Sequence, residues 1–508
     1  MDPHIASPGP EVGIHSTLKR RAVMSTFVLA GRAGVLQFIG LVGNVYVARL
    51  LEPSDFGIYA IVLFALSFFT LLGDAGLAAG LIQKHGTPSQ RELSSVWWLQ
   101  LALSLVVIGV VWVVAPLMIL VWPSIPPQSS WLLRALSFNL FFTAIGVVPS
   151  LLLERDLRFA RISISEVVTA VVFYVVLISL ARRGWGVESF IGAVLSRGLV
   201  GSLLILGMRP WRPSLVFDWS ALRPILRFGM PFQGKTVVGF LNGAVTPLYG
   251  GAVLGSYSLG LNNFARDTAY YPLRLVEIMA RVGFPLYSRL RNDERAFASV
   301  LGRSIRLCAM GTLFFVALIF GLGPRIVHTV YSQRWDSAVP LLYVYTSTIA
   351  LGFLSPLVAA ALDAAGRPQI VFKLSLGWSL LNWIVVAVVL SFTRTALAFA
   401  IAYAVHVVLG NLALLFVTRR LLPLSEMWSW IRASAIAALL TALTGRLLLF
   451  NHAVGPVSLG LCLLVEGALF ALTIAALDRS EVMKLILLYR SVRGTGISGA
   501  PLAPEEQR

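Results

Sequence analysis

Long apolar stretches separated by short polar connections run along almost the whole chain. Fourteen of them are predicted to be membrane-spanning helices, because each is long enough to cross a hydrocarbon core of about 30 Å and none alternates like an outer-membrane strand. The Pro-rich sequence WPSIPPQ at 122–128 predicts a turn between the third and fourth spans. The approximate extents of the spans are 22–46, 56–80, 95–121, 131–153, 162–181, 187–207, 226–250, 254–285, 300–322, 338–362, 370–391, 395–417, 429–450 and 455–477.

Residues 262–285 depart from this apolar pattern. A single helix from Leu254 to Pro285 would be about 48 Å long, and positions 266, 270, 274, 277 and 281 would share one face, reading Arg, Tyr, Arg, Glu, Arg. Ionisable groups at membrane depth are costly and usually face a bundle interior or a wet cavity. We therefore predict that this face lines a water-filled cavity.

Composition identifies the class of protein. Hydrophobic residues make up 57% of the chain and charged residues only 13%, whereas soluble proteins carry about 25% charged residues. The chain is therefore predicted to be an all-α polytopic membrane protein.

The net charge of +18 could indicate a nucleic-acid partner, but the positions of the charges argue against it. With the N-terminus inside, 27 of the 41 Lys and Arg residues fall in inner segments, 7 in outer loops, and 7 within or at the rim of spans. This asymmetry predicts cytoplasmic N- and C-termini. We therefore expect the basic residues to contact membrane lipids with anionic headgroups. A nucleic-acid partner is not expected.

An internal repeat predicts two lobes of six spans each. A shift of 198 positions places Gly31 on Gly229, Gly57 on Gly255 and Tyr59 on Tyr257. Parallel repeats of this kind form two pseudo-symmetric lobes with the substrate site at their interface. The predicted segments are a cytoplasmic N-terminal segment (1–21), an N-lobe (22–210), a cytoplasmic linker (211–225), a C-lobe (226–420), a C-terminal helix pair (421–478) and a cytoplasmic tail (479–508).

Three cations, Arg32, Lys235 and Arg266, are predicted near mid-depth in the first spans of the two lobes, with Asp74 and Asp267 as nearby acids. The functional interpretation is an electropositive central cavity for an anionic group such as a pyrophosphate, for which Arg offers bidentate contacts. The structural alternative is a set of interior ion pairs, in which Arg32 meets Asp74 and Arg266 meets a neighbouring acid.

Other ionisable residues are weaker candidates. Arg274 and Arg281 are possible substrate contacts, but Glu277 lies three and four positions from them on the same helix and is predicted to balance their charge. Interhelical hydrogen bonds or rim positions are the expected roles of Glu166, Arg197, His406 and Glu466.

Motifs of catalysis are missing from the sequence. It has no Ser/His/Asp arrangement, no Cys or His pair at metal-ligand spacing and no GxxxxGK[ST] loop. Cys308 and Cys462 both fall inside apolar spans and are predicted to be small core residues. We therefore predict that the protein is not an enzyme and that it binds neither a metal ion nor a cofactor.

Several segments resemble one family. VARLLEPSDFGIYAIVLFALSFFTLLGDAGLAAGLIQ (47–83) is similar to the N-terminal signature of the polysaccharide-transport, or Wzx-type, flippases of the multidrug/oligosaccharidyl-lipid/polysaccharide exporter superfamily. PLRLVEIMARVGFPLYSRL (272–290), SQRWDSAVPLL (332–342) and ERDLRF (154–159) resemble later stretches of the same family. The outer turn reads SQRW where the family usually has a glycine at the first position.

The resemblance implies a non-enzymatic flippase of a bacterial inner membrane. Two six-helix lobes and two further C-terminal helices would move an undecaprenyl-pyrophosphate-linked oligosaccharide repeat unit to the outer leaflet by alternating access, for exopolysaccharide or O-antigen (lipopolysaccharide) synthesis. A polysaccharide polymerase and glycosyltransferases are further candidate partners. One alternative is a cation-coupled multidrug exporter of the same superfamily, which would need an acid-lined cavity. The other is a membrane-embedded polysaccharide polymerase or ligase, which would need a sizeable outer loop.

Overall fold

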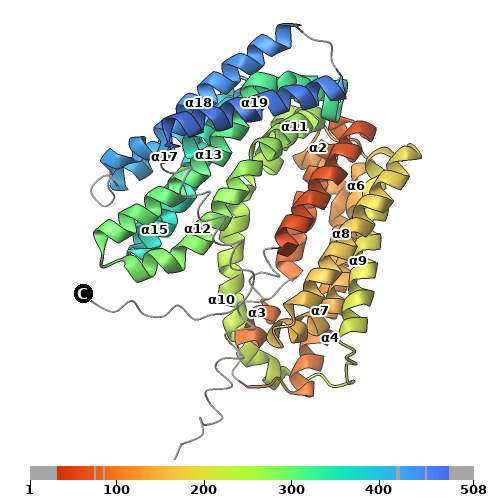
Figure 1. Ribbon diagram of the computed structural model, residues 1–508. Coiled ribbons are helices and arrows are strands. Elements are labelled where there is room, and N and C mark those ends of the chain that lie inside the picture. Colours follow the sequence, from red (N-terminus) through yellow and green to blue (C-terminus); the bar gives the residue numbers. More distant parts are fainter. Residues whose placement is uncertain (1–30, 74–75, 84–85, 419–423, 452–454, 480–508) are drawn as a thin grey trace, which may run out of the picture. The chain divides into compact units, whose positions relative to one another are not determined.

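The computed structural model describes residues 31–73, 76–83, 86–418, 424–451 and 455–479, and over these residues it is almost entirely helical (Figure 1). The chain divides into two compact units. The first contains the residues up to Phe264 together with Val386–Phe399, and the second contains Ala265–Val385 and the residues from Ala400 onward. The division into two six-span lobes was predicted from the repeat in the sequence and not from compactness, and it stays a prediction.

The first unit is a set of long apolar helices. After a helix over Gly31–Leu50 come α2 (Pro53–Gly73), α3 (Leu77–Gln83), α4 (Gln90–Val114), α5 (Met118–Val121), α6 (Ser129–Ser137), α7 (Asn139–Arg155), α8 (Phe159–Arg182), α9 (Ser189–Met208), α10 (Trp219–Gly243) and most of α11 (Gly251–Ala269). Helices α8 and α9 lie side by side, as do α7 and α9 (Figure 1). Residues 122–128 form the predicted non-helical turn before α6.

Two helices of this unit, α2 and α11, approach each other backbone to backbone. A Cβ atom added at Gly57 would lie 1.8 Å from the carbonyl oxygen of Ser256, and one at Gly260 would lie 1.8 Å from that of Pro53. On the other side of the crossing, a Cβ at Gly251 would lie 3.1 Å from Cγ1 of Ile61. The 198-residue shift places Pro53 on Gly251, so both of these paired positions lie at the crossing of α2 and α11.

The connection before α10 is fixed to α4. The Nε1 atom of Trp98 donates to the carbonyl oxygen of Ser214 (2.9 Å), and the backbone N–H of Asp218 donates to Oγ of Ser95 (2.8 Å). Asp218 in turn caps α10 by accepting from the backbone N–H groups of Ser220 and Ala221. The Ser220 hydroxyl and these N–H groups hold the pKa of Asp218 below its usual range. This cap starts α10 at Trp219, inside the segment 211–225 that was predicted to be linker.

The second unit contains α12 (Tyr271–Leu290), α13 (Glu294–Ile326), α14 (Val339–Gly352), α15 (Ser355–Ala364), α16 (Pro368–Phe392), α17 (Ala396–Thr418), α18 (Leu424–Asn451) and α19 (Pro456–Leu477), apart from the segment of α16 and α17 that belongs to the first unit. Its core is formed between α12, α13, α15, α18 and α19, where α13 and α18 pack along each other (Figure 1). Cys308 is buried in this core, and Cys462 is buried in a smaller cluster with Leu322 and Leu459, as predicted.

Twelve helical stretches of the described residues are long and apolar enough to cross a membrane. They correspond to all the predicted spans except 226–250 and 254–285, which the structure forms as α10, α11 and α12. These helices carry more polar and charged residues than the others. Their polar surfaces therefore need contact with protein or water instead of lipid. The prediction of an all-α polytopic membrane protein with about fourteen spans is confirmed.

Candidate substrate-binding site

The polar stretch that interrupts the apolar pattern lies where α11 meets α12. The helical backbone turns at Tyr270, whose N–H donates to the carbonyl oxygen of Arg266 (3.0 Å), while the N–H of Leu273 returns to the carbonyl oxygen of Tyr270 (3.1 Å). Pro272 has no N–H to continue the ladder, so α12 begins anew at Tyr271. A second interruption occurs at Gly255, which has non-helical backbone angles (φ 82°, ψ 169°). The expectation of one continuous helix from Leu254 to Pro285 is therefore wrong.

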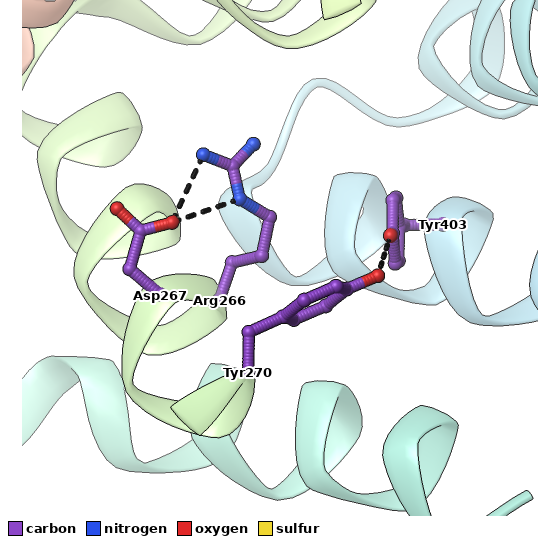
Figure 2. A network of polar contacts seen from close by, with 4 residues as sticks. All are labelled: Arg266, Asp267, Tyr270 and Tyr403. Carbon is purple, nitrogen blue, oxygen red and sulfur yellow. Dashed lines mark hydrogen bonds and ion pairs between the residues drawn. The ribbon is translucent and has the colours of Figure 1, made fainter. Parts of the chain in front are cut away.

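Arg266 occupies the last turn of α11 and pairs with its neighbour Asp267. Nε and Nη2 of Arg266 lie 3.2 and 3.1 Å from the same oxygen, Oδ1 of Asp267 (Figure 2). The Arg266 side chain is 29% exposed, whereas that of Asp267 is 65% exposed. Because both bonds go to one oxygen, Nη1 of Arg266 has no hydrogen-bond partner among the described residues. The predicted alternative, in which Arg266 pairs with a neighbouring acid, is what the structure forms.

Aromatic residues from three elements surround this arginine. The hydroxyl groups of Tyr270 and Tyr403, the latter on α17, form a hydrogen bond (Figure 2). The ring of Tyr345, on α14, lies 5.4 Å from that of Tyr403, which in turn meets the ring of His406 edge-on at 4.7 Å. Both Tyr345 and Tyr403 are close enough to Arg266 to interact with its charge. His406, which is 4% exposed, also lies against Trp378 at 6.2 Å.

This arrangement suits the recognition of an anion. An exposed ion pair between neighbouring residues contributes little to stability, so Asp267 is a carboxylate that a stronger anion can replace. A phosphate group offers several oxygens to the guanidinium, and such contacts are short and strong. The surrounding tyrosines supply hydroxyl donors and flat apolar faces. Chemically, the cluster combines a cation with tyrosine hydroxyl groups and aromatic rings.

The charged residues of α12 lie on the side of the helix that faces away from the core of the second unit. Arg274, Glu277 and Arg281 are exposed, while the opposite face buries Val276, Ala280, Gly283 and Tyr287. The guanidinium of Arg274 lies 5.4 Å from the ring centre of Tyr271. Glu277 has no ion pair with Arg281 among the described residues, and its predicted role in balancing the charges of Arg274 and Arg281 stays a prediction. Their role in substrate binding stays a prediction.

In the first unit, Arg32 pairs with an acid that was not its expected partner. Nη1 of Arg32 lies 2.6 Å from Oε2 of Glu166 on α8. The expected partner, Asp74, lies outside the described residues. Arg32 therefore connects the helix over Gly31–Leu50 to α8.

The Arg32–Glu166 pair is tested by exchanging its charges. We expect Arg32→Glu to lower the unfolding temperature in detergent, because it places two carboxylates together, and Arg32→Glu with Glu166→Arg to recover most of the loss. Thermal unfolding of the two single variants and the double variant measures this coupling. Equal losses that simply add in the double variant would contradict the pair.

The predicted convergence of Arg32, Lys235 and Arg266 near the middle of the membrane stays a prediction. Lys235 belongs to α10, but its side chain lies outside the described residues. Arg32 and Arg266 belong to different units of the structure. The cluster that the structure does form was only partly predicted: Arg266 and Tyr270 were predicted on one face, Asp267 was predicted as a nearby acid, and His406 was a weak candidate. Tyr345 and Tyr403 were missed, and their hydroxyl groups inside apolar spans were the available signal.

Comparison with known proteins identifies relatives of the chain. The family model for a polysaccharide biosynthesis protein matches residues 46–340. The lipopolysaccharide biosynthesis protein WzxC of Escherichia coli K12 is 25% identical over 342 residues, which cover 66% of this chain and 68% of WzxC. The succinoglycan biosynthesis transport protein ExoT of Rhizobium meliloti is 24% identical, over 61% of this chain and 62% of ExoT. The teichuronic acid biosynthesis protein TuaB of Bacillus subtilis is 22% identical, over 69% and 74%. The matches thus span about two thirds of the relatives' length.

Solved structures share the fold. The lipid II flippase MurJ in an inward closed conformation superposes with a TM-score of 0.71 at 15% identity, covering 91% of this chain and all of MurJ. An inward-facing multidrug resistance transporter of the MATE family, from the MOP superfamily, gives a TM-score of 0.54 at 17% identity, covering 76% of this chain and 94% of that transporter. The chain therefore has the all-α polytopic membrane fold that these transporters share.

Proposed function

The chain belongs to the polysaccharide biosynthesis protein family, and from this premise we propose that it is a flippase for a lipid-linked oligosaccharide. Its cargo is a repeat unit joined through a pyrophosphate to a polyprenyl lipid such as undecaprenol. The flippase moves this unit from the cytoplasmic to the outer leaflet of a bacterial inner membrane, where it serves exopolysaccharide or O-antigen synthesis. Relatives named for lipopolysaccharide, succinoglycan and teichuronic acid biosynthesis support this proposal.

The physical problem of such a transporter is the charged headgroup. An ionised group carried through hydrocarbon without a partner costs many kcal/mol. Fixed cations in a water-accessible path lower this barrier because they replace the solvation that the phosphates lose. The observation that carries this step of the proposal is the ion pair of Arg266, which within the described part of the chain is formed with the exposed Asp267.

The proposed chemistry needs no bond to be made or broken. Flipping requires a site that opens to one side of the membrane and then to the other, with the headgroup held by Arg266 and the sugars beside the aromatic residues around it. Arg32, Lys235, Arg274 and Arg281 are further proposed contacts, with Asp74, Asp267 and Glu277 as charge-balancing groups. A polymerase and glycosyltransferases that use the same lipid-linked unit are the proposed protein partners, and both termini are proposed to be cytoplasmic.

Reconstituted vesicles test the proposal. A polyprenyl-pyrophosphate-linked oligosaccharide is placed in the inner leaflet, and its appearance outside is followed with an enzyme or lectin that cannot enter the vesicle. We expect exposure of the sugar to depend on the protein and to be absent from vesicles that hold a denatured sample. No exposure with any pyrophosphate-linked donor, together with efflux of an organic cation, would replace the proposal by a multidrug exporter.

A further inference from the structure

A carboxylic acid lies in the middle of the buried face of α19. Glu466 is fully buried (0% exposed), on the stripe that packs Leu459, Cys462, Phe470 and Ile474 against the rest of the second unit. It is the eleventh residue of the 22-residue helix Pro456–Leu477, so it lies about 15 Å from either end. In a helix that crosses the membrane, this position is near the middle of the hydrocarbon.

Two glycines provide the space for this side chain. A Cβ atom added at Gly445, on α18, would lie 2.0 Å from Oε1 of Glu466, and one added at Gly321, on α13, would lie 3.2 Å from the same oxygen. Helices α13, α18 and α19 pack side by side (Figure 1). The carboxyl group thus fills a gap at the crossing of three helices that any other residue at position 445 would close.

Among the residues that the structure describes, no cation pairs with this carboxyl group. Neither oxygen of Glu466 has a hydrogen-bond partner among the described residues, so the interhelical hydrogen bond predicted for it is not formed. Four basic side chains of the packed elements have contacts with other groups. Arg306 pairs with Asp478 (3.4 Å), Arg325 contacts Sγ of Cys462 (3.3 Å), His328 pairs with Asp336 (2.9 Å), and Arg446 lies over the ring of Tyr343 (5.3 Å), while the thiol of Cys308 lies in the core cluster.

We propose that Glu466 is a proton-binding site, which keeps its proton while α13, α18 and α19 are closed and releases it when they separate. An ionised carboxylate without water or a cation is far costlier to bury than the neutral acid. A metal ion is a poor occupant, because Na⁺ or Ca²⁺ needs a set of oxygen ligands, whereas glycines line this gap. On release the O–H bond breaks, the proton passes to water admitted between the helices, and the carboxylate is hydrated by the same water. The inference stands independently of the transported substrate.

Carbodiimide labelling tests the site directly. Dicyclohexylcarbodiimide reacts with protonated carboxyl groups in apolar surroundings, so the full-length protein is treated at pH 7 and its peptides are analysed by mass spectrometry. We expect Glu466 to be labelled at least tenfold more than the exposed Glu426 of α18, and labelling to fall as the pH rises toward 9. Absence of label on Glu466 at pH 7, or protection of Glu466 by Na⁺ at constant pH, would overturn the proposal.

Cys462 reports the accompanying opening, since it lies one turn from Glu466 on α19. The ratio of N-ethylmaleimide modification at Cys462 to that at Cys308 is measured from pH 6 to 9 in the wild type and in Glu466→Gln, which keeps the shape of the side chain without its charge. We expect the ratio to rise at least threefold more in the wild type, because only there does opening release a proton, so that a higher pH favours the open arrangement. The same rise in both proteins would contradict the coupling of proton release to opening. The labelling experiment on the wild type remains decisive if Glu466→Gln fails to fold.

Discussion

Replacing Arg266 by alanine is expected to reduce the rate of lipid-linked oligosaccharide flipping by about 10- to 100-fold without removing the protein from the membrane. Charge-assisted hydrogen bonds contribute about 1.5–3 kcal/mol each, and every 1.4 kcal/mol lost from the transition state is about tenfold in rate. The pair with Asp267 is exposed and local, so its loss has little effect on stability. The measurement is the initial rate of sugar exposure in the vesicle assay, at matched protein content.

Three further variants show which property of Arg266 matters. Arg266→Lys keeps the charge but loses the planar fork, so an intermediate rate is expected. Arg266→Gln keeps much of the volume without the charge and is expected to match Arg266→Ala. The control is Arg295→Ala, at the exposed start of α13, which is expected to flip at the wild-type rate. Normal flipping by Arg266→Gln would remove Arg266 from the proposed headgroup site, although the family assignment would stand.

Local features of the chain were predictable because they depend on neighbours in sequence. The number and approximate extents of the apolar spans, the turn at 122–128 and the burial of both cysteines follow from hydrophobicity and breaker residues alone. The break at Tyr270 was not predicted. Pro272 was the available signal, but prolines are also tolerated inside membrane helices. The start of α10 was placed too late because Asp218 was not recognised as its cap.

Contacts between distant helices were not predictable from one sequence. The structural alternative for Arg32 was an ion pair with Asp74, but the structure pairs it with Glu166 on α8. Tyr403 is 137 positions from Arg266, and no periodicity connects the two. Which acid meets which base depends on how the helices pack, and the apolar pattern that places each helix in the membrane carries no information about its neighbours.

One departure from the family pattern gains a structural meaning. Ser332 occupies the first position of SQRW, where the family usually has glycine, and its backbone has a φ of 110°. That conformation favours glycine over residues with a Cβ atom. The turn is kept in place by Trp335, which is fully buried. The backbone of this turn thus favours glycine, and this chain has a serine there.

The crossing of α2 and α11 leads to the second prediction, which concerns stability. Gly260→Ala and Gly57→Ala each place a Cβ atom 1.8 Å from a backbone carbonyl oxygen, that of Pro53 or Ser256. No rotation of a side chain relieves such a contact, so the two helices must move apart. Overpacking of this kind costs about 1–3 kcal/mol, occasionally more, and we expect the unfolding temperature in detergent to fall by several degrees and the monodisperse fraction to decrease.

The same substitution elsewhere provides the control for this crossing. Gly239→Ala in α10 and Gly109→Ala in α4 meet no atom within 4 Å, and alanine is favoured over glycine in a helix interior by about 1 kcal/mol. Both controls are expected to unfold at or above the wild-type temperature. If Gly260→Ala and Gly57→Ala unfold with the controls, α2 and α11 do not pack as closely as the structure places them. The close approach of the two helices depends on glycine at both positions, because a Cβ atom at either one would meet a backbone carbonyl oxygen.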